Sequence, residues 1–335
     1  MPSTIPSAPP ATPPSATPSE FDLIRRHFTR PTRHTDLAGG DDAALLHPQP
    51  AMQLAVSTDM LVAGTHFFAD ADAEDLGWKT LAVNVSDLAA MGASPRWAFL
   101  ALALPGADEA WLAAFARGLF ACADAHGVDL AGGDTTRGPL TLSVTIIGEV
   151  PNGAAITRAG GRAGDDLWVS GQPGLAALGL AALRTEAQLS AAGRAACLAA
   201  LHRPQPRVAL GLALRGIATA MLDVSDGLLG DLGHILECSG TGAIIELGAL
   251  PLAPLLDTGA DEPLARRCLL GGGDDYELLF AAPAAKRAEV HALSAGLGLA
   301  LHRIGELTAE PGVLWLREGD GRLVRGTRSG YDHFG

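Results

Sequence analysis

The stretch EDLGWKTLAVNVSDLAAMGA, residues 74–93, carries the clearest structural pattern in the chain. It predicts a helix from about Glu74 to Met91. Four apolar residues recur at helical spacing and form one buried stripe: Trp78, Leu81, Val85 and Leu88. Asn84 and Asp87 lie three residues apart on another face, so both can point toward one polar feature. The stretch therefore predicts a core helix that also presents a carboxylate.

Segments with helical and strand patterns alternate on both sides of this helix. Before residue 151 we expect a helix over Asp108–His126 and strands at Met52–Thr58, Arg96–Leu104, Val128–Ala131 and Leu140–Val150. After residue 164 we expect helices over Leu175–Leu183, Leu228–Cys238 and about Ala284–Ala295, and strands at Asp166–Ser170, Ala220–Asp223, Ala243–Leu247, Glu277–Ala281, Leu301–Leu307 and Val313–Leu316. The intervening Pro151–Gly164 holds four glycines and is typical of a connection between domains. The pattern predicts an α+β protein of two domains, residues 21–150 and 151–335.

Composition narrows the class of protein. A length of 335 residues suits two domains, and 48% hydrophobic residues can fill two cores. The formal net charge of −13 would repel nucleic acid or an anionic membrane surface. No stretch approaches the roughly 18 uncharged apolar residues of a membrane-spanning helix. We therefore expect a soluble enzyme with neither nucleic acid nor membrane as its partner.

The N-terminus and the cysteines indicate a cytoplasmic protein. Residues 1–20 hold seven prolines with Ser, Thr and Ala, which predicts a disordered tail rather than a signal peptide. The four cysteines stand singly, without a C-x-x-C pair, in helical stretches rich in Ala and Leu. Each is expected to be a buried, reduced thiol: Cys122, Cys197, Cys238 and Cys268.

Aspartates beside small residues are the main chemical feature. The P-loop, the dinucleotide fingerprint, the kinase H-R-D, the zincin helix and the G-x-S-x-G elbow are all absent. Six sites instead pair Asp with Gly, Ser or Thr: Gly40–Asp42, Ser57–Asp59, Ser86–Asp87, Gly132–Asp134, Asp223–Gly227 and Gly272–Asp275. Any one of them can be a simple turn or helix cap, because Asp, Ser and Gly favour those positions.

Convergence of these carboxylates would require cations. Two carboxylates about 5 Å apart repel by roughly 3 kcal/mol at an effective dielectric near 20. Carboxylate and hydroxyl oxygens are hard ligands that suit Mg²⁺ rather than zinc. Glycines beside them let backbone N–H groups approach phosphate oxygens. The residues alone therefore indicate an enzyme that depends on a nucleotide and on a hard cation, Mg²⁺ or Mn²⁺.

Seven stretches together resemble the thiamine-monophosphate kinase family. In chain order they are Gly40–Ala44, Ser57–Phe67, Trp78–Ala93, Gly132–Thr136, Asp223–Leu228, Asp274–Leu278 and Gly330–Phe334. The resemblance runs from about Phe21 to Gly335 and leaves out only the proline-rich tail. It implies the superfamily of aminoimidazole-ribonucleotide synthetase and selenophosphate synthetase. In that fold an N-terminal domain pairs across a homodimer into a β-barrel, and a C-terminal α/β domain packs on it.

The resemblance also assigns roles to residues of this chain. The Mg²⁺ ligands would be Asp41, Ser57, Thr58, Asp59, Asp87, Asp134, Asp223 and Asp226. The ATP contacts would be Gly133, Asp134, Arg158 and Ser225. The contacts to the thiamine substrate would be His66, Asp274 and Tyr331. No residue is expected to act as a catalytic acid, base or nucleophile.

Two positions depart from the family pattern, and three assigned residues have simpler readings. Asp274 stands where the family usually has Glu, one methylene longer, and Gly39 replaces an apolar residue before the first Asp pair. Taken alone, His66 can cap a turn, Arg158 can be a solvated linker charge, and Tyr331 can pin the C-terminus.

The activity that the resemblance implies is phosphorylation of thiamine monophosphate by ATP, giving thiamine diphosphate. The acceptor is itself an ionised phosphate, so direct in-line transfer assisted by several Mg²⁺ ions needs no strong base. Two other hypotheses stay open. One is a sister ATP-dependent synthetase of the same superfamily, and the other is a non-catalytic regulator that binds nucleotide and metal.

Overall fold

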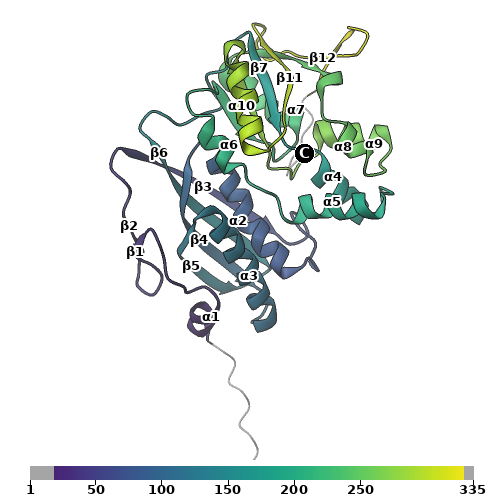
Figure 1. Ribbon diagram of the computed structural model, residues 1–335. Coiled ribbons are helices and arrows are strands. Elements are labelled where there is room, and N and C mark those ends of the chain that lie inside the picture. Colours follow the sequence, from purple (N-terminus) through teal and green to yellow (C-terminus); the bar gives the residue numbers. More distant parts are fainter. Residues whose placement is uncertain (1–18, 328–335) are drawn as a thin grey trace, which may run out of the picture.

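A four-stranded sheet with two long helices on one face forms the first half of the protein, as the computed structural model in Figure 1 shows. The structure describes residues 19–327, so Tyr331 and the prolines before residue 19 lie outside it. In sheet order the strands are β3 (Met52–Val62), β6 (Thr141–Pro151), β4 (Ser94–Leu104) and β5 (Asp129–Arg137). The covering helices are α2 (Ala73–Ala90) and α3 (Glu109–His126).

The two helices pack closely because glycines face each other across their contact. A Cβ added at Gly77 would lie 2.0 Å from the carbonyl oxygen of Phe115, and one at Gly118 would lie 1.7 Å from that of Glu74. The predicted stripe of α2 is buried here, with Leu81, Val85 and Leu88 inside the first core beside residues of α3 and β4. Three small elements precede the sheet: α1 (Glu20–His27), β1 (Thr35–Leu37) and β2 (Leu45–Leu46).

A seven-stranded mixed sheet forms the second half. In sheet order its strands are β13 (Leu323–Arg325), β12 (Leu314–Arg317), β9 (Gly242–Glu246), β11 (Leu301–Thr308), β7 (Asp165–Ser170), β10 (Leu278–Pro283) and β8 (Ala220–Asp223). On one face lie α4 (Leu175–Leu183), α5 (Ala191–His202), α7 (Leu228–Ser239), α8 (Ala253–Leu256) and α9 (Glu262–Gly271). On the other lie α6 (Val208–Ala213) and α10 (Arg287–Leu297). Strands β7 and β10 and the edge strand β8 are buried almost throughout, on both faces of the sheet.

Helix α2 joins the two halves (Figure 1). Its last residues, Ala89 and Ala90, belong to a core shared with α6 and the second sheet. A Cβ at Gly211 would lie 2.0 Å from the Ala89 carbonyl oxygen, so α6 sits directly against α2. The indole N–H of Trp78 also donates to the carbonyl of Pro204 at 2.8 Å. One helix thus positions both halves of any site that lies between them.

The predicted α+β class is confirmed, and most expected elements occur within a few residues of their predicted bounds. The boundary at residue 150 stays a proposal, supported by β6 ending at Pro151 and β7 starting at Asp165. The burial expected for every cysteine is wrong for Cys238, which is exposed near the end of α7. Helix α9 has no counterpart among the expected helices, although its buried residues recur at helical spacing. Within residues 19–327, no helix has the length and apolar character needed to cross a membrane.

Candidate active site

Four carboxylates gather where α2 meets β3 and the turn after β8. We call Asp59, Asp87, Asp223 and Asp226 the acidic cluster. The Ser57 hydroxyl donates to Asp87 at 2.5 Å. Asp87 also acts electrostatically on Asp59 and Asp223, and Asp226 acts on Asp59. The cluster therefore draws on both halves of the chain.

Local geometry of β3 and α2 explains the placement. Side chains alternate along a strand, so Ser57 and Asp59 point to the same face, toward α2. There the side-chain oxygen of Asn84 accepts the backbone N–H of Asp59 at 3.1 Å. Ser86 and Asp87 are neighbours on the helix, so their side chains diverge by about 100°. As a result Asp87 meets β3, while the Ser86 hydroxyl donates to Asp223 at 2.6 Å.

The turn from Asp223 to Gly227 is held by a residue absent from the sequence prediction. One oxygen of Asp231, in the first turn of α7, accepts the backbone N–H groups of Ser225, Asp226 and Gly227 at 3.0, 3.0 and 3.1 Å. Asp231 is buried, and burial first, with repulsion from Asp226, raises its pKa to about 6. Its position just after a D-x-x-D-G turn, at the start of a helix, is the signal that could have revealed it.

The acidic cluster carries more negative charge than its surroundings offset. Burial, together with repulsion from Asp87 and Asp226, raises the pKa of Asp59 to about 6. Burial and repulsion from Asp87 raise the pKa of Asp223 to about 7. Burial also raises the pKa of Asp87, against the opposing effects of its Ser57 hydrogen bond and the positive charge of Arg158. Arg158 is thus near enough to act on the cluster.

The donor set fits Mg²⁺. Carboxylate and hydroxyl oxygens are hard ligands, and a divalent cation would relieve the repulsion that raises these pKa values. Among residues 19–327, no three His, Cys, Asp or Glu side chains are already arranged around one metal position. Mg²⁺ bound by a few carboxylates together with substrate phosphates does not need such a ready-made cage. Asp59, Asp87, Asp223 and Asp226 are the residues that could hold it.

A second group, made of Lys79, Asp274 and Tyr276, lies at the side of the acidic cluster and includes one predicted residue, Asp274. Asp274 forms an ion pair with Lys79 of α2, with 2.9 Å between Nζ and Oδ2, and accepts the hydroxyl of Tyr276 at 3.1 Å. Tyr276 in turn feels the charges of Asp59 and Asp223. His66, in the turn after β3, accepts the Val62 N–H on Nδ1 at 3.0 Å. The backbone carbonyl of Ser225 accepts the N–H of Asp274 at 2.8 Å, which joins the two groups.

Four predicted residues have other surroundings. The Thr58 hydroxyl meets Thr145 at 2.9 Å, on the sheet face away from α2. Asp134 is exposed on β5 and pairs in register with Ala101. Asp41 is exposed and accepts the N–H of the next residue. A Cβ at Gly133 would lie 1.9 Å from the Leu100 carbonyl, so strand packing alone requires this glycine. Within the described residues, no hydrogen bond or ion pair links these four to the acidic cluster.

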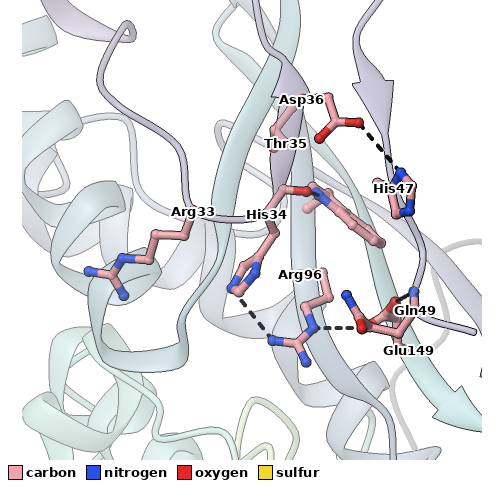
Figure 2. A pocket seen from close by; sticks show the side chains of 9 residues that line it. Arg33, His34, Thr35, Asp36, His47, Gln49, Arg96 and Glu149 are labelled. Carbon is pink, nitrogen blue, oxygen red and sulfur yellow. Dashed lines mark hydrogen bonds and ion pairs between the residues drawn. The ribbon is translucent and has the colours of Figure 1, made fainter.

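A cavity of about 370 Å³ lies at the other face of the first sheet (Figure 2). Arg96 bridges its two sides, donating to Glu149 at 2.9 Å and meeting the His34 ring at 3.5 Å. Buried Asp129 fixes the segment entering the cavity by accepting the backbone N–H groups of Arg33 and His34. Arg96 and Glu149 are paired with each other and Asp129 is satisfied by backbone N–H groups, so the cavity has the character of a structural polar cluster.

The comparisons assign the two halves of the chain to one class of protein. The model of the AIR synthase related protein N-terminal domain matches residues 40–150, and that of the C-terminal domain matches residues 162–315. Thiamine-monophosphate kinase of Escherichia coli K12 is 46% identical over 320 residues, covering 94% of this chain and 98% of that protein.

Solved structures of thiamine-monophosphate kinases are also similar to this chain. The chain resembles the thiamine-monophosphate kinase of Stenotrophomonas maltophilia K279a with 47% identity and a TM-score of 0.80, covering 90% of this chain and 95% of that one. The structure of AaThiL complexed with AMPPCP and TMP is 29% identical with a TM-score of 0.74, covering 94% of this chain and 96% of that one. This chain belongs to the thiamine-monophosphate kinase family, which confirms the resemblance seen in its motifs.

Proposed function

We propose that this protein transfers the terminal phosphoryl group of ATP to thiamine monophosphate and so makes thiamine diphosphate. The observation that supports this proposal is the acidic cluster, which lies beside Arg158 and beside the Lys79–Asp274 pair. Such a site can hold cation-bound phosphates on one side and an organic cation on the other. The identity of 46% to a curated thiamine-monophosphate kinase supports this substrate over that of a sister synthetase.

Catalysis at such a site rests on alignment and charge. The acceptor phosphate is ionised at neutral pH, so no side chain has to remove a proton. The acidic cluster would hold Mg²⁺, and the bound cation would neutralise phosphate charge. Ser57 and Ser86 fix the orientation of Asp87 and Asp223 through short hydrogen bonds, and Asp231 fixes the turn that carries Asp226. Arg158 offers a positive charge to the phosphates.

The acceptor is recognised at both of its ends. We assign His66 to its phosphate and Asp274 to its cationic thiamine portion, with Tyr331 assigned by resemblance outside the described residues. A site built for a charged phosphate rejects an analogue that lacks it far more strongly than it rejects a missing methylene. Free thiamine should therefore not be phosphorylated.

The deciding experiment supplies purified protein with ATP, Mg²⁺ and either thiamine monophosphate or free thiamine, and identifies products by mass. Formation of thiamine diphosphate only from the monophosphate supports the proposal. Comparable turnover of free thiamine overturns the acceptor assignment, and ATP binding without any product favours a regulator. Radiolabelled phosphate trapped on the protein during turnover would contradict direct transfer.

The partner in solution is a second copy of the chain. On β3, alternate apolar residues point away from α2 and are 37%, 46%, 60% and 56% exposed: Met52, Leu54, Val56 and Met60. An edge strand with such a face needs a cover, and pairing with a second copy supplies one. Sedimentation should show a dimer at micromolar concentration, and Val56→Glu should shift it toward monomer. A wild-type monomer under these conditions would refute the homodimer.

We also propose a cytoplasmic location. It is supported by the four cysteines, all of which are free thiols in the structure. In a reducing compartment such thiols persist without forming disulfides. Thiol titration of protein isolated under alkylating conditions should find all four reduced, and a disulfide in the isolated protein would contradict the proposal.

A further inference from the structure

Residues 273–277 form a strained loop whose backbone is firmly held. Asp274 and Tyr276 have φ values of +71° and +53°, in the left-handed region that residues with a Cβ avoid. The N–H of Asp274 donates to the Ser225 carbonyl and that of Tyr276 to the Val224 carbonyl, both at 2.8 Å. Strain of this kind persists only where the surroundings dictate it, and it gathers at functional sites.

Two further acidic side chains anchor the same loop from behind. Asp275 accepts the N–H of Gly174, just before α4, at 2.7 Å. Both oxygens of the buried Glu277 accept from the guanidinium of Arg207, at 2.7 and 2.5 Å, and Ser170 donates to it as well. These contacts leave Asp274 as the acidic side chain of the loop that faces α2.

Lys79 meets this carboxylate from the other half of the chain. It is one of only two lysines in the sequence, and its side chain is 7% exposed. Its ammonium lies 2.9 Å from Oδ2 of Asp274, while the Tyr276 hydroxyl lies 3.1 Å from Oδ1. Both oxygens are therefore fixed, across a separation of 195 residues in the chain.

We propose that Lys79 is a positioning residue for recognition of the acceptor. It holds Asp274 at a defined distance from the acidic cluster and, with Tyr276, orients that carboxylate toward the organic cation of the acceptor. Its positive charge also limits the repulsion that a further carboxylate would add beside the cluster. The proposal rests on the proposed function and adds to it a specificity determinant outside the phosphate-handling residues.

The short side chain of Asp274 makes a fixed position necessary. Where the family usually has Glu, this chain has one methylene less, so the carboxylate stays nearer its backbone and depends on its neighbours for direction. A purely structural ion pair would stabilise the contact between the halves and would leave the relative affinities for ATP and acceptor unchanged. A positioning role changes the affinity for the acceptor alone.

The test compares Lys79→Met with Lys286→Met, a change at the only other lysine, which is exposed and paired with Glu289. We measure the KM of each substrate, and calorimetry follows binding of thiamine monophosphate without ATP. Lys79→Met should raise the acceptor KM about tenfold or more, which corresponds to roughly 1.4 kcal/mol, and leave the KM for ATP within about twofold. Lys286→Met should match wild type, and Lys79→Arg should recover part of the loss.

A double-mutant cycle with Asp274→Asn tests whether Lys79 acts through Asp274. If it does, Lys79→Met adds little once the carboxylate is gone. Full additivity, or an equal rise in both KM values, overturns the proposal. If Lys79→Met fails to fold, Tyr276→Phe is the second variant, because it removes the hydrogen bond from the Tyr276 hydroxyl to Asp274. An unchanged acceptor KM and an unchanged affinity for thiamine monophosphate in that variant would also overturn the proposal.

The proposed function and the role of Lys79 fail in different ways. Active wild type with an unaffected Lys79→Met overturns only the role of Lys79. Wild type that binds thiamine monophosphate without turnover overturns the function, and calorimetry on the variants then decides the role of Lys79. Wild type that neither binds nor phosphorylates thiamine monophosphate overturns both.

Discussion

Asp166 and the acidic cluster have opposite surroundings. Asp166, on β7 of the second sheet, is 2% exposed and is enclosed by two arginines. Arg287 donates to both of its oxygens at 2.9 Å, and Arg303 donates to one of them at 2.5 Å. In the acidic cluster the positive charge of Arg158 acts on Asp87, while the charges that raise the pKa values of Asp59 and Asp223 are those of other aspartates.

The pKa of an aspartate carboxyl group shifts in opposite directions at the two places. Burial alone would raise the pKa of Asp166, but hydrogen bonds and charges from Arg287 and Arg303 outweigh it and lower that pKa. In the acidic cluster, burial and mutual repulsion act together and raise the pKa values of Asp59 and Asp223. A carboxylate supplied with partners stabilises the fold, whereas carboxylates left without them are ready to bind a cation.

The largest effect should follow from Asp87→Asn. Loss of this charge at the centre of the cluster should lower kcat/KM by about a thousandfold or more, as expected when transition-state electrostatics are lost. Stability without metal should be unchanged or higher, because one repelling carboxylate is gone. Steady-state kinetics at saturating Mg²⁺ and thermal unfolding in EDTA check the two parts.

A matched control for Asp87→Asn is Asp87→Glu, which keeps the charge and should retain more activity than the amide. Near-wild-type turnover of Asp87→Asn would remove this residue from the site. A large drop in melting temperature would instead give Asp87 the structural role assigned here to Asp166.

The fold could be predicted from the sequence where the pattern is set by local spacing. The helix expected over residues 74–91 is Ala73–Ala90, and Leu175–Leu183 and Ala220–Asp223 match their predicted bounds. Periodic apolar residues and Gly or Asp at the ends encode such elements within a few turns of chain. Helix α9 is missing from the expected elements although it has the same local signals, since Asp261 caps its start and its buried residues recur at i, i+1, i+4 and i+5: Leu264, Ala265, Cys268 and Leu269.

The site could be predicted only as a set of residue types. The motifs identify Asp87 and Asp223 as candidates, but their meeting depends on how the two halves pack. Asp231 and Lys79 went unrecognised for the same reason, since each acts through a partner that only the fold supplies. The predicted strand already implies that the adjacent Ser57 and Thr58 point to opposite faces, but only the fold shows that Ser57 is the one that meets Asp87.

The next largest effect is expected for Asp166, the aspartate that stabilises the fold. Asp166→Asn should lower the free energy of unfolding by about 2 kcal/mol, because two arginines lose their charged hydrogen-bond acceptor. The KM values should stay within about twofold of wild type at temperatures where the variant is folded. Urea unfolding and kinetics on the same preparation check this. A loss of activity at temperatures where the variant is still folded would contradict the distinction between Asp166 and the acidic cluster.

A smaller effect is expected for Asp231→Asn. The amide oxygen can still accept, so the turn should form, but three backbone N–H groups lose a charged acceptor. We expect kcat/KM to fall about tenfold, as is usual when a residue that orients a metal ligand is altered. The apparent affinity for Mg²⁺ should weaken in parallel. Unchanged Mg²⁺ dependence would show that Asp231 serves only the helix start.

The smallest effect is the pH dependence of stability in EDTA. The pKa of Asp223 is about 7 in the folded protein and about 3.9 in an unfolded chain. Between these values the unfolded chain has lost its proton while the folded protein keeps it, so stability falls as the pH rises. Asp59, with a pKa of about 6, acts in the same direction, whereas Asp166 loses its contribution only in acid, below about pH 4.

The melting temperature in EDTA should therefore fall by roughly 3 °C between pH 5 and pH 8. Asp223→Asn should reduce this fall, most clearly between pH 5 and pH 7, where the folded protein would otherwise keep a proton that the unfolded chain has lost. Asp166→Asn should melt at a lower temperature and keep the wild-type slope. Mg²⁺ should raise the melting temperature more at pH 8 than at pH 5, because it binds the ionised carboxylates. An Asp223→Asn variant with the full wild-type slope would show that the charge repulsion lies elsewhere in the protein.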